Sequence, residues 1–261
     1  MFSAEQLFGM ALKGVAKKTL FLTFDDGPGV TNGNGAGPKT QKIAEYLHAE
    51  NIPATFFVTG KNAAAYPEVL AKLHELGHLI GNHTYNHPNL TAVDDDYDIV
   101  GELIATNKEI APYIKNNTVY LRPPYGNWSA KVAAKLNKGL YEQTSYDYMG
   151  PFYSDIDGSD WACWRDGKTG AECAAGYLEL ILKKKRLFFN SANDLNKHIV
   201  LMHDSTADDE QMMNNNRTYE ALQVMIPILK EKGYSFDRLD NIKPEVLRRQ
   251  YAYTARADYK P

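Results

Sequence analysis

Short apolar runs alternate with stretches of helical periodicity along most of this chain. Closely spaced apolar residues predict strands at residues 19–24, 54–60, 78–83, 118–124, 140–148, 197–205 and 234–239. Apolar residues that recur about every three to four positions predict helices at residues 39–51, 66–77, 96–114, 129–138, 174–186 and 217–233. Ser129 is suited to cap the start of the fourth helix.

This alternation predicts an α/β fold with a parallel sheet. About seven strand–helix units fit a closed or nearly closed barrel, and an open doubly wound sheet is the alternative. The glycines of residues 29–40 lack the spacing and the strand-to-helix context of a dinucleotide site. We therefore expect a flexible surface loop there, beside the functional site.

The length of 261 residues suits one large α/β domain. We expect an N-terminal extension at residues 1–17, a single catalytic domain at residues 18–240, and a C-terminal tail at residues 241–261 that packs on the domain. The N-terminus is a poor signal peptide, because Glu5 and Gln6 stand where basic residues are expected. We expect that a leader is absent from this sequence.

Composition narrows the classes of protein. A content of 44% hydrophobic and 23% charged residues is that of an ordinary globular protein. The net charge of -3 argues against a nucleic-acid partner, which usually requires a basic face. The sequence holds no uninterrupted apolar run long enough to span a bilayer.

Two cysteines, Cys163 and Cys173, flank a polar stretch that contains glycine. Such a stretch can turn back and bring the sulfurs together, which would indicate an oxidising compartment. Two free thiols remain the alternative.

Polar residues that could take part in catalysis or bind a metal follow the ends of several predicted strands. In an α/β barrel the carboxyl ends of the strands share one face, where active sites lie. Residues far apart in sequence should therefore converge. The residues at these strand ends are Asp25, Asp26, His83, His87, Arg122, His203 and Asp204.

Two histidines and one carboxylate among them can bind a metal ion. His83 and His87 lie four positions apart, and Asp26 can supply the carboxylate. This is a normal three-ligand set for a catalytic Zn²⁺ with one position left open. The cation would also neutralise one of two adjacent carboxylates, so that Asp25 stays ionised.

Five ordered motifs resemble those of the polysaccharide deacetylases of carbohydrate esterase family 4. They are "TFDDGP", "HTYNHP", "RPPYG", "DIDGSDW" and "LMHD", and the similarity extends from about Lys18 to Asp240. The resemblance implies a distorted (β/α) barrel. It also implies that Asp25 is the general base and that Asp26, His83 and His87 bind one divalent ion, usually Zn²⁺, with Co²⁺, Ni²⁺ or Mn²⁺ possible.

The resemblance assigns further roles by motif position. Arg122 would hold the base, and His203 would be the general acid oriented by Asp160. Tyr125 would stabilise the oxyanion through its backbone N–H and contact the substrate. The other expected substrate contacts are Pro123, Trp161 as a wall of the groove and Leu201 as the floor of an acetyl pocket.

The implied function is removal of N-acetyl groups from N-acetylglucosamine residues of a polysaccharide, with peptidoglycan favoured. The alternatives are a chitin or chitooligosaccharide deacetylase, an esterase or amidase on a small acetylated substrate, and a non-catalytic carbohydrate-binding protein. We expect a monomer that is secreted or lies in the periplasm or cell envelope. The aromatic residues that either stack on sugar rings or pack in the core are Tyr85, Tyr125, Trp128, Trp161 and Trp164.

Overall fold

A computed structural model describes residues 1–7, 15–16, 18–30, 39–182, 197–206, 215–243, 246 and 258–260. Three predicted features lie partly outside these described residues. They are the glycine-rich loop (its residues 31–38), the helix predicted at residues 174–186 (its last four residues) and most of the C-terminal tail. No helix in these ranges combines the length and the apolar composition needed to cross a bilayer.

The described chain alternates strands and helices, as the periodicity predicts. The strands are β1 (Thr19–Asp25), β2 (Thr55–Val58), β3 (Leu79–Asn82), β4 (Thr118–Tyr120), β5 (Asp147–Met149), β6 (Ile156–Asp157), β7 (Lys197–His203) and β8 (Ser235–Phe236). The helices are α1 (Thr40–Ala49), α2 (Gly60–Ala65), α3 (Pro67–Glu75), α4 (Ile99–Ile110), α5 (Ala130–Gln143), α6 (Asp160–Arg165), α7 (Gly170–Leu182) and α9 (Thr218–Glu231).

Parallel pairing confirms the predicted α/β class. One sheet has the strand order β3-β2-β1-β7-β6, with β8 beside β1, and a second sheet pairs β4 with β5. A parallel bridge between Asn82 and Leu121 joins the two sheets, and another between Leu7 and Phe152 lies beyond β5. Together these contacts curve the strands into most of a distorted barrel.

Strand β1 shows how the sheet separates the barrel interior from the helical layer. Leu20, Leu22 and Phe24 pack in the cluster shared with the helices, whereas Phe21 packs in the interior cluster. Successive side chains of a strand point to opposite faces, so Asp25 faces inward with Phe21. Strand parity therefore already aims the first aspartate into the barrel.

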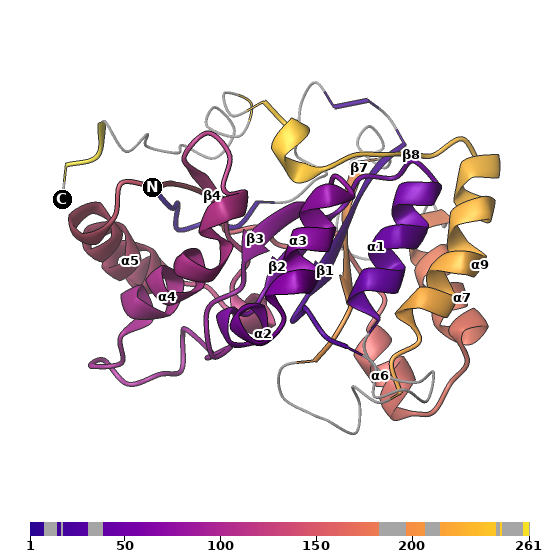
Figure 1. The fold of residues 1–261 in the computed structure, drawn as a ribbon, viewed down its shortest axis with the longest axis horizontal. Coiled ribbons are helices and arrows are strands. Elements are labelled where there is room, and N and C mark those ends of the chain that lie inside the picture. The colour runs from indigo at the N-terminus through magenta and orange to yellow at the C-terminus, as the bar shows by residue number, and fades with distance from the viewer. Residues whose placement is uncertain are drawn as a thin grey trace.

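The helices form a nearly continuous outer layer. Figure 1 shows α4 and α5 at one end of the molecule, α7 and α9 at the other, and the strands between them. Contacts run from α5 through α4, α2, α3, α1 and α9 to α7. This layer covers the outward faces of the central strands.

The predicted strand at residues 140–148 is wrong in its first half. Helix α5 continues to Gln143, and strand β5 begins only at Asp147. Leu140 is fully buried and extends the apolar stripe of Leu136 and Val132 along the helix, so burial of this stripe favours the longer helix. The predicted cap is confirmed, because Ser129 Oγ accepts a hydrogen bond from the backbone N–H of Val132.

Three short elements were missed by the periodicity: α2, β6 and α6. Each has six residues or fewer, which is too short for a periodic pattern to be recognised.

The described N-terminal residues 1–7 pack on the domain. Met1, Phe2 and Leu7 are buried, and the side-chain amide of Gln6 donates to the backbone carbonyl of Gly126.

Candidate active site and metal centre

The neighbouring strands β1 and β7 bring Asp25 and the "LMHD" motif together. In the parallel register of β1 and β7, Asp25 pairs with His203, and Thr23 pairs with Leu201. All four residues have the inward parity of Phe21, which lies in the interior cluster. The "TFDDGP" and "LMHD" motifs therefore meet at the same end of the barrel.

A tight turn redirects the chain directly after Asp25. Asp26 has a positive φ of 77°, and its carbonyl accepts a hydrogen bond from Asn62 Nδ2 at 2.7 Å. Gly27 allows a close approach, since a Cβ there would lie 2.0 Å from a carboxylate oxygen of Asp204. Asp204 is fully buried, and burial raises its pKa to about 7 despite the hydrogen bond from Thr40 Oγ1. The turn thus brings both carboxylates to His83, whose Nε2 lies 3.7 Å from an oxygen of Asp25 and 3.3 Å from an oxygen of Asp26.

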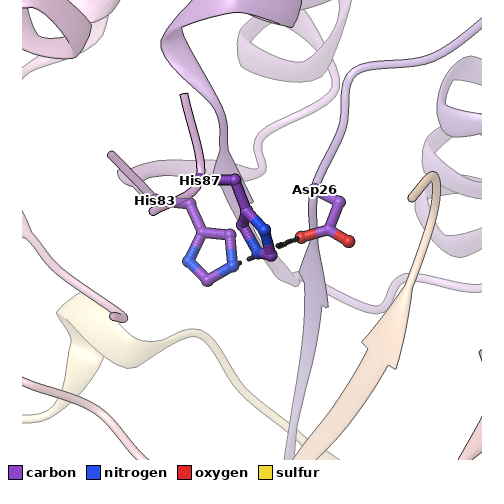
Figure 2. Close-up of side chains that lie close together, drawn as sticks. All are labelled: Asp26, His83 and His87. Carbon is purple, nitrogen blue, oxygen red and sulfur yellow. Dashed lines mark ion pairs between the residues drawn. The ribbon is translucent and has the colours of Figure 1, made fainter. Parts of the chain in front are cut away.

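The side chains of Asp26, His83 and His87 converge, as Figure 2 shows. Asp26 Oδ1 lies 3.3 Å from His83 Nε2 and 3.2 Å from His87 Nε2. One candidate ligand atom from each residue lies within 4.8 Å of the others, and all three residues are buried. Burial raises the pKa of Asp26, but hydrogen bonds from both histidines and the nearby charge of His87 outweigh it and hold the pKa well below its usual range.

The orientation of His83 suits metal binding. Its Nδ1 lies 2.7 Å from the backbone carbonyl of Arg122, so Nδ1 carries the proton and donates to that oxygen. Its Nε2 faces Asp26 Oδ1 at 3.3 Å, and this nitrogen becomes a metal ligand when it gives up its proton to bind an ion. A hydrogen bond made by the ring nitrogen that does not bind the metal commonly fixes the tautomer of a metal-binding histidine. Two imidazole nitrogens and one carboxylate oxygen therefore fit a divalent ion of the zinc type.

Arg122 holds Asp25 in the barrel interior. Its Nη1 donates to Asp25 Oδ1 at 2.8 Å and to Thr23 Oγ1 at 2.7 Å. Its other guanidinium nitrogens donate to the backbone carbonyls of Phe152 and Tyr153 at 3.3 and 3.4 Å. Both members of the ion pair are buried, so removal of either would leave an uncompensated charge.

A second ion pair joins the partly buried His203 to the buried Asp160. His203 Nδ1 lies 2.7 Å from Asp160 Oδ1, while Asp160 Oδ2 accepts from the backbone N–H of His203 and from Thr218 Oγ1. Burial lowers the pKa of His203, but the charge and hydrogen bond of Asp160, with smaller contributions from Asp26 and Asp25, raise it to about 10. The imidazole is therefore a cation at neutral pH.

A cavity of about 390 Å³ connects these groups. Of the predicted site residues, Asp160 and Pro123 are buried and do not belong to its lining. The predicted residues that line the cavity are Asp25, Asp26, His83, His87, Arg122, Tyr125, Trp161, Leu201 and His203.

Sequence reasoning missed several residues of the lining. Asp157 and Tyr153 are the two with the most evident chemistry. Desolvation raises the pKa of Asp157, and the negative charges of Asp160 and Asp25 add to this effect, while a hydrogen bond from the Ser159 N–H opposes it. Asp157 stands within the "DIDGSDW" motif, so its position was a usable signal, whereas Tyr153 belongs to no motif.

The aromatic candidates divide between cavity and core. Tyr125 is 55% exposed and Trp161 is 39% exposed, and both line the cavity. The Tyr125 ring lies against that of His87, with centroids 4.6 Å apart. Trp164 is fully buried in the core, and Trp128 donates its indole N–H to the backbone carbonyl of Ser3. Tyr125 also adopts an uncommon positive φ of 57°, as residues at functional sites often do.

Cys163 and Cys173 form a disulfide, so the alternative of two free thiols is excluded. The bond joins α6 to α7. Because α6 carries both Asp160 and Trp161, the covalent link lies directly behind the site.

Comparison with known proteins agrees with this geometry. A profile of the polysaccharide deacetylase family matches residues 13–143. A chitooligosaccharide deacetylase of Rhizobium leguminosarum bv. trifolii is 30% identical over 87% of this chain and 92% of its own length. The peptidoglycan-N-acetylmuramic acid deacetylase PdaA of Bacillus subtilis is 30% identical over 88% of this chain and 73% of its own.

Among solved structures, a peptidoglycan N-acetylglucosamine deacetylase superposes with a TM-score of 0.62 at 28% identity. The superposition covers 87% of this chain and 88% of that one. The sequence relatives and the structure thus agree on the fold and on the class of reaction. This chain belongs to the polysaccharide deacetylase family and is an enzyme of the hydrolase type.

Proposed function

We propose that this protein is a metal-dependent N-deacetylase that acts on N-acetylglucosamine residues of a polysaccharide, with peptidoglycan as its substrate. The observation that carries the proposal is the buried set of Asp26, His83 and His87 beside an ionisable Asp25. The family of the chain supports the reaction class, and its relatives include deacetylases of peptidoglycan and of chitooligosaccharides.

Asp26, His83 and His87 would hold one divalent ion, for which Zn²⁺ is our first choice because two nitrogens and one oxygen match its usual catalytic ligands. When bound, such an ion supplies Lewis-acid polarisation of the acetyl carbonyl and makes water more acidic. The cavity beside these ligands gives the substrate access from one side.

Asp25 is the proposed general base. Its carboxylate is held by Arg122 at 2.8 Å and lies 3.7 Å from His83 Nε2, beside the ligand set but directed by a different partner. A positioned carboxylate can accept a proton from the attacking water. The guanidinium group holds the carboxylate in one orientation through the hydrogen bond from Arg122 Nη1.

His203 is the proposed general acid. The amine is a poor leaving group and requires a proton as the C–N bond breaks. His203 carries that proton at neutral pH because Asp160 raises its pKa to about 10. Base and acid come from neighbouring strands, paired in register as Asp25 and His203.

The remaining cavity residues receive substrate roles. We assign the backbone N–H of Tyr125 to the oxyanion, Leu201 to the acetyl methyl group, and Trp161 to one wall of the sugar groove, where exposed aromatic faces suit stacking on a sugar ring. Pro123 is buried, so its proposed role reduces to shaping the loop that carries Tyr125. The disulfide supports a location outside the reducing cytoplasm, in the cell envelope or medium.

Mass spectrometry tests both activity and substrate. Peptidoglycan fragments and chitooligosaccharides are incubated with the Zn²⁺-loaded protein, and the loss of acetyl units is followed, with a chelator-treated sample as control. Loss of acetyl from peptidoglycan fragments supports the proposal. Loss from chitooligosaccharides alone would favour the second candidate, which the 30% identical chitooligosaccharide deacetylase supports. No loss from either glycan would refute the proposed activity.

A further inference from the structure

Glu102 is a buried carboxylate outside the five motifs, and it contacts the turn between His83 and His87. It lies in the first turn of α4. Its Oε2 accepts hydrogen bonds from the backbone N–H groups of Tyr85 and Asn86 at 2.8 and 2.7 Å. Its Oε1 accepts from Asn86 Nδ2 at 2.8 Å and from the Tyr97 hydroxyl at 2.7 Å. Three of these four donors belong to the turn.

The turn needs such support because its backbone is strained. Thr84 and His87 have positive φ values of 66° and 59°, which cost energy for residues other than glycine. The carbonyls of Thr84 and Tyr85 accept from the N–H groups of Gly60 and Lys61 at the start of α2. The N–H groups of Tyr85 and Asn86 are satisfied by Glu102, so α2 and α4 hold the turn from its carbonyl and amide sides.

An ionised carboxylate is well suited to this position. It accepts up to four hydrogen bonds and donates none, and here four donors converge on it. The Glu102 hydrogen bond is the largest cause that raises the pKa of Tyr97 to about 12, so the hydroxyl stays a donor. Neither a neutral amide nor an apolar side chain can satisfy all four donors at once.

We propose that Glu102 is a positioning residue of the metal centre, which sets the separation and orientation of His83 and His87 through the turn that joins them. The inference rests on the proposed metal-dependent function. His83 is also held by its Nδ1 bond to the Arg122 carbonyl, whereas His87 lies at the far end of the turn and packs on His83 and Tyr125. Loss of Glu102 should therefore act mainly by displacing His87.

The test measures metal binding by the whole chain, without substrate. Affinity for Zn²⁺ is determined by competition with a chromophoric chelator, and the visible absorption of the Co²⁺-loaded protein reports the ligand geometry. Glu102→Ala should weaken Zn²⁺ binding by about 10–100-fold, as removal of a supporting partner behind metal ligands typically does, and should alter the Co²⁺ spectrum. Glu102→Gln keeps the side-chain shape and part of the hydrogen bonding, so a smaller loss in the same direction is expected.

Val100→Ala is the matched control on the same helix. Val100 is buried and faces Gly139 of α5, away from the turn. We expect this variant to unfold at lower urea concentration while it keeps the parent Zn²⁺ affinity and Co²⁺ spectrum.

The outcomes separate the inference from the proposed function. If both Glu102 variants bind Zn²⁺ as tightly as the parent with the parent Co²⁺ spectrum, the positioning role is overturned. If Val100→Ala weakens metal binding as much as Glu102→Ala, general loss of stability explains the effect and the inference fails. A parent protein that binds neither ion overturns the proposed function itself.

Discussion

Asp160→Asn tests whether a buried carboxylate keeps His203 protonated. The two side chains are joined by a hydrogen bond of 2.7 Å, and the pKa of His203 is raised to about 10. Asparagine keeps the size of the side chain and a hydrogen-bond acceptor but removes the charge. Burial, which lowers the pKa of His203, is left largely unopposed, so the pKa should fall to its ordinary value of about 6.5 or below.

The pKa shift translates into a rate. At about pH 7.5, a histidine with a pKa near 10 is almost fully protonated, whereas one with a pKa of about 6.5 is protonated in roughly a tenth of the molecules. We therefore expect kcat/KM of Asp160→Asn to be lower by at least about tenfold at that pH, and to fall by about a further decade per pH unit above it. A bound cation offsets the contribution of Asp26, so the alkaline limb of the parent should lie at or below about pH 10.

The assay is the pH profile of kcat/KM, measured by amine release from an N-acetylated oligosaccharide between about pH 6 and pH 10. Asp157→Asn serves as control, because Asp157 lines the same cavity but accepts a hydrogen bond from Ser159. This variant should keep the alkaline limb of the parent. An unchanged alkaline limb in Asp160→Asn would refute the assignment of Asp160 and His203 as a coupled acid.

The same pair links stability to pH. The pKa of His203 is higher in the folded chain than in the unfolded chain, so the protonated form favours folding. This stabilisation is complete below about pH 6.5 and is lost as the pH rises to about 10. Asp160→Asn should flatten this part of the stability profile.

Three further predictions concern the other supports of the site. Asp25→Asn should retain Zn²⁺ binding but abolish turnover, whereas His83→Ala should lose both Zn²⁺ binding and turnover. Calorimetric titration measures Zn²⁺ binding, and release of acetate measures turnover. Near-parent turnover of Asp25→Asn would exclude the base role. Arg122→Met leaves the buried Asp25 carboxylate unpaired and should lower the free energy of unfolding by about 3–5 kcal/mol in urea denaturation; a cost below about 1 kcal/mol would show that the ion pair is not needed for stability. Replacing Cys163 and Cys173 together by serine should cost roughly 2–3 kcal/mol by the chain-entropy model, measured in the same way, and an unchanged midpoint would contradict that contribution.

Much of the candidate site could be predicted because the residues that the structure brings together follow strand ends. Strand parity alone places Asp25 on the inward face with Phe21, and the same parity applies to His203. The pair His83 and His87 could be assigned to a metal because imidazoles and a nearby carboxylate form a recognisable donor set. Here local pattern and final geometry agree, since parallel strands end at one face.

Other features had no local signal. Leu140 reads equally well as part of a strand or of a helix, and only packing of the α5 stripe against its neighbours decides between them. Tyr153 enters the cavity because residues 1–7 hold its segment, through the hydrogen bond from the Tyr153 N–H to the Leu7 carbonyl. Glu102 resembles an ordinary solvent-exposed helix residue until the turn beneath it is seen.

By itself, the sequence determined the α/β class, the order of the motifs and the chemical nature of the candidate metal ligands, because periodicity and side-chain chemistry are local properties. Only the tertiary structure decided which aromatic residues line the cavity, that Cys163 and Cys173 pair, and that Glu102 supports the histidine turn. These outcomes depend on contacts between distant segments. Such contacts are set by how helices and strands pack, which no short stretch of sequence encodes.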